Sequence, residues 1–164
     1  MTVLRPDLLT GRGIALVGVA QPIKDALAEL GARTEGDIDA VVYDAREAFG
    51  DGGGEGLASA SAQAWTTIRE LAAETMIPTQ RPGKVVLIAP RPDAGSFAQA
   101  SRAALENLAR TLSVEWARYG ITATAITPGA ATTDEQLGEL VCFLVSPAGD
   151  YFSGCRFSLG VSEP

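Results

Sequence analysis

The stretch at residues 97–129 constrains the fold of this chain more than any other. It reads FAQASRAALENLARTLSVEWARYGITATAITPG, and neither Pro nor Gly interrupts it before Gly120. Its apolar residues recur at helical spacing and predict one amphipathic helix of about 23 residues, roughly 34 Å long. Residues 121–127 alternate and are rich in β-branched side chains, which indicates a strand that a Pro-Gly pair ends. A helix of this length followed by a buried strand needs a sheet to pack against.

Four further apolar runs have the length and composition of buried strands, at residues 14–19, 38–43, 85–89 and 155–159. Segments with helical spacing separate them, and the last of these begins with a capping box of Thr133 and Gln136. The glycine-rich segment at 51–56 is expected to be a flexible connecting loop. Alternating strands and helices predict a single α/β domain over residues 1–164, with three layers: a parallel sheet of about five strands and helices on both faces.

Charge and composition narrow the range of functions. A net charge of −7 argues against binding to nucleic acid or to an anionic membrane. No apolar run reaches the roughly 18 residues of a membrane span, and the N-terminal residues lack the apolar core of a signal peptide, so a cytoplasmic protein is expected. Cys142 and Cys155 are expected to be buried free thiols.

The absence of histidine restricts the chemistry most. With no histidine in 164 residues, Ser-His-Asp and Cys-His catalysis and histidine-ligated metals are excluded, and no metal site is expected. Any catalytic mechanism would have to use Ser, Tyr, Lys, Arg or carboxylate side chains.

The segment SRAALENLARTLSVEWARYGITATAITPG resembles the core of the short-chain dehydrogenase/reductase family. Three flanking segments agree with that family: GKVVLIAP, GDIDAVVYDA and GELVCFLVSPAGDYFSGCRFSLG. The resemblance covers nearly the whole chain in the right order. It implies a Rossmann-like sheet that keeps strands 1-4-5-6-7 in family terms and lacks the edge strands on the adenosine side.

The same resemblance locates the family's catalytic Asn-Ser-Tyr-Lys set on this chain. By position the Tyr falls on Ala98, the Lys on Arg102, the Ser on Ala89 or Pro90, and the Asn near Ser61. Proton transfer in the family needs an ionisable phenol beside a cation, and alanine has no proton to give. The sequence therefore predicts no catalytic residue at these positions.

The family's cofactor site is also reduced here. The Gly-rich turn has a single glycine, Gly18, and the family's Asn-Asn-Ala-Gly segment now contains Asp44, whose carboxylate disfavours a phosphate-rich ligand. The remaining family features are Pro128, Gly129 and Thr133, which can also be read as a strand-ending turn and a helix cap. No cofactor is expected from this set.

The missing strands have a topological consequence. Either the first helix changes face, or its connection to the next strand is left-handed, whereas about 98% of such crossovers are right-handed. We expect the left-handed connection. The first strand then becomes an apolar edge strand, which needs some cover against association with other chains.

The leading hypothesis is a non-catalytic subunit that assembles with an active short-chain dehydrogenase/reductase homologue and stabilises or regulates it. In the family the two long helices form the dimer contact, which implies a heterodimer or α2β2 heterotetramer. The interface residues expected from this are Trp65, Ile68, Leu105, Leu112 and Trp116.

Two alternatives remain open. One is an NAD(P)-dependent oxidoreductase with a non-standard site, in which Arg102 is the cation. Its acid would be Tyr43, Tyr119 or Tyr151, and its polarising hydroxyl Ser96 or Ser101. The other is a stand-alone module that binds a small ligand at the carboxyl ends of the strands, where Arg46, Arg91 and Arg102 could hold an anion.

Overall fold

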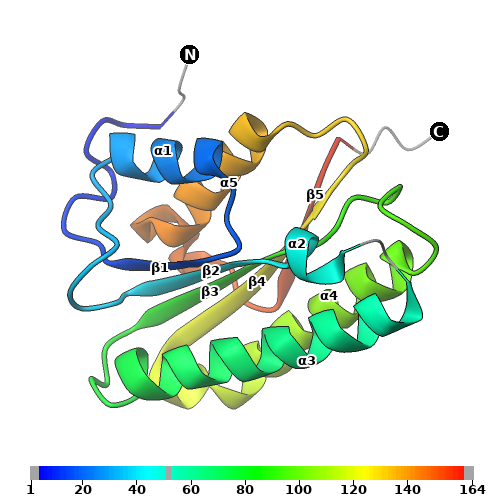
Figure 1. Cartoon of the computed structure of the whole chain (residues 1–164). Helices are drawn as coiled ribbons and strands as arrows, with labels where there is room; N and C mark the ends of the chain where they lie inside the picture. The colour runs from blue at the N-terminus through cyan, green and yellow to red at the C-terminus, as the bar shows by residue number, and fades with distance from the viewer. Residues whose placement is uncertain (1–3, 51–52, 161–164) are drawn as a thin grey trace.

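The structure is a computed structural model that describes residues 4–50 and 53–160. Five parallel strands form one sheet in the order β1-β2-β3-β4-β5, with helices on both faces, so the predicted fold class is confirmed (Figure 1). The strands are β1 Ile14–Val17, β2 Ala40–Asp44, β3 Gly83–Ile88, β4 Ile121–Pro128 and β5 Cys155–Leu159. The helices are α1 Gln21–Glu29, α2 Ala45–Phe49, α3 Gly54–Leu71, α4 Ala98–Glu115 and α5 Asp134–Val145.

The central strands are buried on both faces, which explains their continuous apolar sequences. In β2, Val41 and Tyr43 pack in the core beneath α3 and α4, whereas Ala40 and Val42 pack in the core beneath α1 and α5. Every residue of β2 and β3 is buried. The sheet therefore separates two hydrophobic cores, and only the ends of its strands can carry a site.

The connections between strands follow an unusual topology. All of them step across the sheet in one direction, yet α1 and α5 lie on one face while α3 and α4 lie on the other (Figure 1). With a common direction, opposite faces require opposite handedness. The connections through α1 and α5 are left-handed, whereas about 98% of such crossovers are right-handed. The predicted left-handed connection through the first helix is therefore present, and α5 adds a second one.

The strand β1 lies at the edge of the sheet, as predicted, and a backbone segment covers the start of its free side. The Ile14 N–H donates to the Arg33 carbonyl oxygen over 2.7 Å, and the Arg33 N–H donates to the Arg12 carbonyl oxygen over 2.8 Å. These bonds use the polar groups that would otherwise offer this end of the edge to another strand.

Several element boundaries differ from the predicted ones. The short helix α2 was not predicted. The helix α3 continues into a π-helical turn, Ala72–Met76, and α4 ends at Glu115. The predicted loop at 51–56 is only partly observable, because residues 51 and 52 lie outside the described residues and Gly54 already begins α3. The capping box at the start of α5 is confirmed, with Thr133 and Gln136 bonded reciprocally.

Four of the five residues expected at a subunit interface lie inside the chain's own core. Ile68, Leu105, Leu112 and Trp116 are at most 6% exposed, whereas Trp65 on α3 is 39% exposed. The prediction was wrong for these four because helical spacing identifies an apolar face but not its neighbour. In this chain that face packs against its own sheet.

The two cysteines differ in burial. Cys142 is buried, as expected, and burial raises the pKa of its thiol to about 12. Cys155 is half-exposed, so the expectation of burial was wrong for this residue. Within the described part of the chain, no helix is both long and apolar enough to cross a membrane.

Candidate functional site

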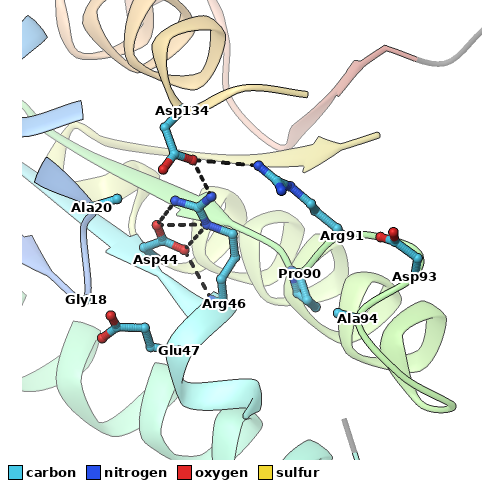
Figure 2. A pocket seen from close by; sticks show the side chains of 10 residues that line it. All are labelled: Gly18, Ala20, Asp44, Arg46, Glu47, Pro90, Arg91, Asp93, Ala94 and Asp134. Carbon is cyan, nitrogen blue, oxygen red and sulfur yellow. Dashed lines mark hydrogen bonds and ion pairs between the residues drawn. The ribbon is translucent and has the colours of Figure 1, made fainter. Parts of the chain in front are cut away.

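A crevice opens at the carboxyl ends of β1, β2 and β3, where the connections leave the sheet toward opposite faces. Such crevices are where ligands bind in open α/β sheets. This one has a volume of about 490 Å³ (Figure 2). We call it the strand-end cleft. Its lining residues are Gly18, Ala20, Asp44, Arg46, Glu47, Pro90, Arg91, Asp93, Ala94 and Asp134.

The Arg46 side chain lies across the strand-end cleft and joins two carboxylates from distant parts of the chain (Figure 2). Its Nε lies 2.9 Å from Oδ1 of Asp44, and its Nη2 lies 2.6 Å from Oδ2 of the same carboxylate. Its Nη1 lies 2.5 Å from Oδ1 of Asp134, the first residue of α5. The hydrogen bonds to Asp44 are the largest influence on the pKa of Arg46 and raise it above its usual value. The guanidinium is thereby fixed in the cleft.

Local structure explains how Asp44 and Arg46 meet. Asp44 ends β2, and its side chain also accepts a hydrogen bond from the Arg46 N–H, which caps the N-terminus of α2. An N-cap aspartate holds the following turn of helix in place, so the Arg46 side chain starts from a fixed position. The Asp44 carboxylate is only 1% exposed and therefore depends on these partners.

A second arginine closes the side of the strand-end cleft next to β3. The Nη2 of Arg91 donates to the Thr132 carbonyl oxygen over 2.6 Å and lies 3.8 Å from Oδ1 of Asp134. The cleft lining thus includes two arginines and four acids (Asp44, Glu47, Asp93 and Asp134), which leaves two negative charges in excess. This balance disfavours anionic ligands.

The turn between β1 and α1 is shaped by packing against β2. Gly18 has φ of +66°, and a Cβ at this position would lie 2.7 Å from the Asp44 carbonyl oxygen. A side chain here would be strained and would clash with the end of β2. The close approach that requires this glycine is therefore to the chain's own backbone.

The positions that the resemblance assigns to the family's catalytic residues carry apolar side chains or a hydroxyl that is already hydrogen-bonded. Ala98 and Ala89 are fully buried. The hydroxyl of Ser61 donates to the Leu57 carbonyl oxygen, one turn back in α3, over 2.8 Å. Ala98 packs with Phe49 of α2 in a small apolar cluster rather than facing a polar site.

Arg102, which the resemblance aligns with the family's lysine, is hydrogen-bonded to the carbonyl groups at the ends of two strands. Its Nη1 donates to the carbonyl oxygens of Pro90 and Pro128, over 2.8 and 2.7 Å. Burial lowers the pKa of Arg102, and Arg156 lowers it further. The structure thus brings together three of the positions identified from the sequence: Pro90, Arg102 and Pro128. Their contact links the ends of two strands.

The other residues identified by the resemblance lie in the turn after β4 and at the start of α5. The Gly129 N–H donates to the Thr132 hydroxyl over 2.8 Å, and a Cβ on Gly129 would lie 2.8 Å from the Leu159 carbonyl oxygen. The Thr133 hydroxyl accepts from the Gln136 N–H in the capping box. In the described residues these groups serve a strand-ending turn and a helix cap, the second of the two interpretations of this segment.

The residues of the alternative catalytic set do not form a common site. Tyr119 follows α4 at the end that precedes β4, with the Arg118 guanidinium 4.7 Å from its ring centre. Tyr151 is 90% exposed. Ser101 is buried, whereas Ser96 lies in the exposed loop before α4.

Tyr43 is the third tyrosine of that set, and it lies in the core between the sheet and α3 and α4. Its hydroxyl is buried with no hydrogen-bond partner among the described residues. Burial raises the pKa of this phenol, and the Asp44 carboxylate raises it further. Tyr43 is therefore poorly suited to donate a proton at neutral pH.

Removal of the Tyr43 hydroxyl should stabilise the protein. A buried donor without a partner carries a desolvation cost, so we expect Tyr43→Phe to raise the free energy of unfolding by about 1 kcal/mol. Urea denaturation followed by circular dichroism measures the change. Tyr151→Phe is the control, because that ring is 90% exposed and its hydroxyl keeps its contact with water. A Tyr43→Phe variant less stable than the wild type would show that the hydroxyl has a partner in solution.

Several residues of the strand-end cleft were not predicted from the sequence, chiefly Asp134, Glu47 and Asp93. Asp134 could have been recognised as an acid in the first turn of a helix that follows a capping threonine. Its pairing with Arg46, 88 positions away, leaves no local signal in the sequence.

Comparison with known proteins gives matches at the level of structure alone. A scan against protein families finds no match, and no curated protein matches the sequence. A short-chain type dehydrogenase/reductase from Mycobacterium marinum has a TM-score of 0.79 at 19% identity, and the alignment covers 100% of both chains. The 3-ketoacyl-(acyl-carrier-protein) reductase of Brucella melitensis, complexed with NADH, has a TM-score of 0.76 at 13% identity, with 93% of this chain and 98% of that chain covered.

A third neighbour is the citronellol catabolism dehydrogenase of Pseudomonas aeruginosa, with a TM-score of 0.74 at 18% identity. Its alignment covers 96% of this chain and 97% of that chain. The chain therefore has the fold of the short-chain dehydrogenases/reductases, as the sequence resemblance implied.

Proposed function

We propose that this chain is a non-catalytic subunit with the short-chain dehydrogenase/reductase fold, which assembles with a catalytically active homologue and stabilises or regulates it. The observation that carries the proposal is the position of Arg46, which spans the strand-end cleft between Asp44 and Asp134. A ligand in this cleft would meet a guanidinium whose charge two carboxylates already neutralise.

The residues of the strand-end cleft do not fit a dinucleotide cofactor. A pyrophosphate needs free backbone N–H groups and a neutral or positive surface, and here the lining carries two excess negative charges. The single glycine of the turn approaches β2 instead of leaving space for a ligand. The positions of the proton donor and of its cation hold Ala98 and an Arg102 bonded to two carbonyl oxygens. These features support a role that does not involve hydride transfer by this chain.

The proposed contact with the partner uses the outer faces of α3 and α4. Two large apolar side chains are exposed there, Trp65 at 39% and Val114 at 78%. Aromatic residues at the surface are enriched in protein interfaces. We expect these helices to pack against the equivalent helices of the homologue, in a heterodimer or an α2β2 heterotetramer.

Native mass spectrometry of the chain isolated from its own cells tests the assembly. The expected spectrum contains a complex of this chain with one or two copies of a larger short-chain dehydrogenase/reductase subunit. A spectrum that contains only monomers or only homo-oligomers would contradict the proposal. Trp65→Ala should reduce the complex while leaving the folded chain intact.

The second candidate function is an NAD(P)-dependent oxidoreductase, and the structural neighbours favour it, since one of them is a reductase in complex with NADH. Thermal denaturation with added NADH or NADPH separates the two candidates. A cofactor at about 100 times its dissociation constant stabilises the folded state by about 2.7 kcal/mol. We expect no shift relative to sodium chloride of equal ionic strength. A rise in melting temperature with either cofactor would favour the oxidoreductase.

A further inference from the structure

A second pocket lies on the α4 side of the sheet, beside the ends of β4 and β5. Its volume is about 570 Å³. We call it the Arg102–Arg156 pocket. The residues that matter for its chemistry are Gln99, Arg102 and Glu106 of α4, Thr127 of β4, and Arg156 and Ser158 of β5. It is separate from the strand-end cleft, because the two pockets share no lining residue.

The charge of Arg102 is not neutralised by a carboxylate. Its Nη1 is bonded to two carbonyl oxygens, and none of the ion pairs among the described residues includes this side chain. The side chain is partly buried, and this burial lowers its pKa. A partly desolvated cation without a counter-ion attracts an anion more strongly than a solvated surface arginine does.

A second guanidinium faces the same pocket. Arg156 is the other influence that lowers the pKa of Arg102, so the two cations lie close enough to repel each other. The Nη1 of Arg156 lies 3.0 Å from Oε2 of Glu106, while Oε1 of the same carboxylate lies 2.6 Å from Nη2 of Arg110. One carboxylate is thus shared by two arginines, and Arg102 adds a third cation. Among the groups that line the pocket, the two arginines and Glu106 leave an excess of one positive charge.

Hydroxyl groups complete the polar surface of the pocket. The Oγ1 of Thr127 and the Oγ of Ser158 lie 3.0 Å apart, on neighbouring strands and on the same face of the sheet. Thr127 can also donate to the Phe157 carbonyl oxygen over 3.3 Å. When Thr127 instead donates to the Ser158 hydroxyl across the 3.0 Å contact, the Ser158 hydrogen is free to donate toward the pocket. The first turn of α4, which contributes Gln99, adds the positive end of the helix dipole.

We propose that the Arg102–Arg156 pocket binds a small organic molecule through an oxyanion group, either a carboxylate or a phosphate. Two guanidiniums and a hydroxyl are the groups that recognise such oxyanions. The volume leaves room for an organic body beyond the anion itself. This site shares no lining residue with the strand-end cleft, so the argument for it does not rest on the proposed function.

Titrations with sodium phosphate and with sodium succinate, followed by amide chemical shifts in the full chain, test the proposal. Sodium chloride at equal ionic strength is the reference. We expect saturable shifts of the Gln99 and Ser158 amides with at least one of the two anions. The anion that binds more tightly distinguishes a phosphate ligand from a carboxylate ligand.

A pair of matched variants tests which arginine holds the anion. Because a charge-assisted hydrogen bond is lost, Arg156→Gln should weaken binding about tenfold. Arg110→Gln removes the other partner of Glu106, and Arg110 does not line the pocket. The affinity of this variant for the anion should therefore stay within about twofold of the wild-type value. Amides that respond to phosphate and succinate no more than to chloride would overturn the proposal. Equal weakening by the two variants would do the same, since it would indicate attraction by net charge alone.

Discussion

Replacement of Arg46 by alanine should lower the free energy of unfolding by about 3–5 kcal/mol, because it leaves a buried carboxylate without its partner. The Asp44 side chain is 1% exposed, and the Arg46 side chain is 19% exposed. The three hydrogen bonds of 2.6–3.0 Å that the Arg46 side chain donates to this carboxylate are not replaced by water at this depth. Urea denaturation monitored by far-ultraviolet circular dichroism measures the loss.

Two further variants isolate the buried charge as the cause. Asp44→Asn in the Arg46→Ala background removes the unpaired charge and keeps an oxygen that can cap α2, so part of the lost stability should return. Arg110→Ala removes an arginine whose side chain is 63% exposed, and should cost less than about 1 kcal/mol. An Arg46→Ala variant within about 1 kcal/mol of the wild type would show that the cleft admits water and that Asp44 is hydrated there.

The fold could be predicted because its strands are buried on both faces. A strand such as Val85 to Ile88 has apolar side chains on both faces, so its sequence is a continuous apolar run, which is typical of the strands of a parallel sheet. The start of α5 was predictable for a local reason as well, since both members of its capping box lie within one turn. The short α2 was missed because its five residues carry too little periodicity to be recognised.

The candidate site was predictable only where its groups lie next to a strand end. Asp44 was identified by its place in the sequence, and Arg46 and Arg91 were expected at the carboxyl ends of the strands, where the structure places them. Their partners could not be predicted, because Asp134 meets Arg46 across 88 positions. The same limit applies to Arg102, whose bonds to the carbonyl oxygens of Pro90 and Pro128 depend on the register of β3 and β4.

Substitutions on the inner and outer faces of α3 and α4 should have opposite effects on stability and on assembly. Leu112 was expected at a subunit interface, but it is fully buried in the core against the sheet. Leu112→Ala should therefore destabilise the isolated chain by about 3 kcal/mol, through lost burial and the cavity left behind. The melting temperature of the purified chain should fall without any partner present.

Trp65→Ala is the matched variant on the other face of the same helix pair. Its side chain is 39% exposed, so the stability of the isolated chain should change by less than about 1 kcal/mol. The opposite order is expected for assembly, because an exposed tryptophan at the centre of an interface contributes strongly to binding. If Leu112→Ala left the melting temperature unchanged, the interior face of α4 would have to be free in solution. The core described between the sheet and these helices would then be contradicted. A large loss of stability in Trp65→Ala would instead place that residue in the core and remove the main apolar contact proposed for the partner.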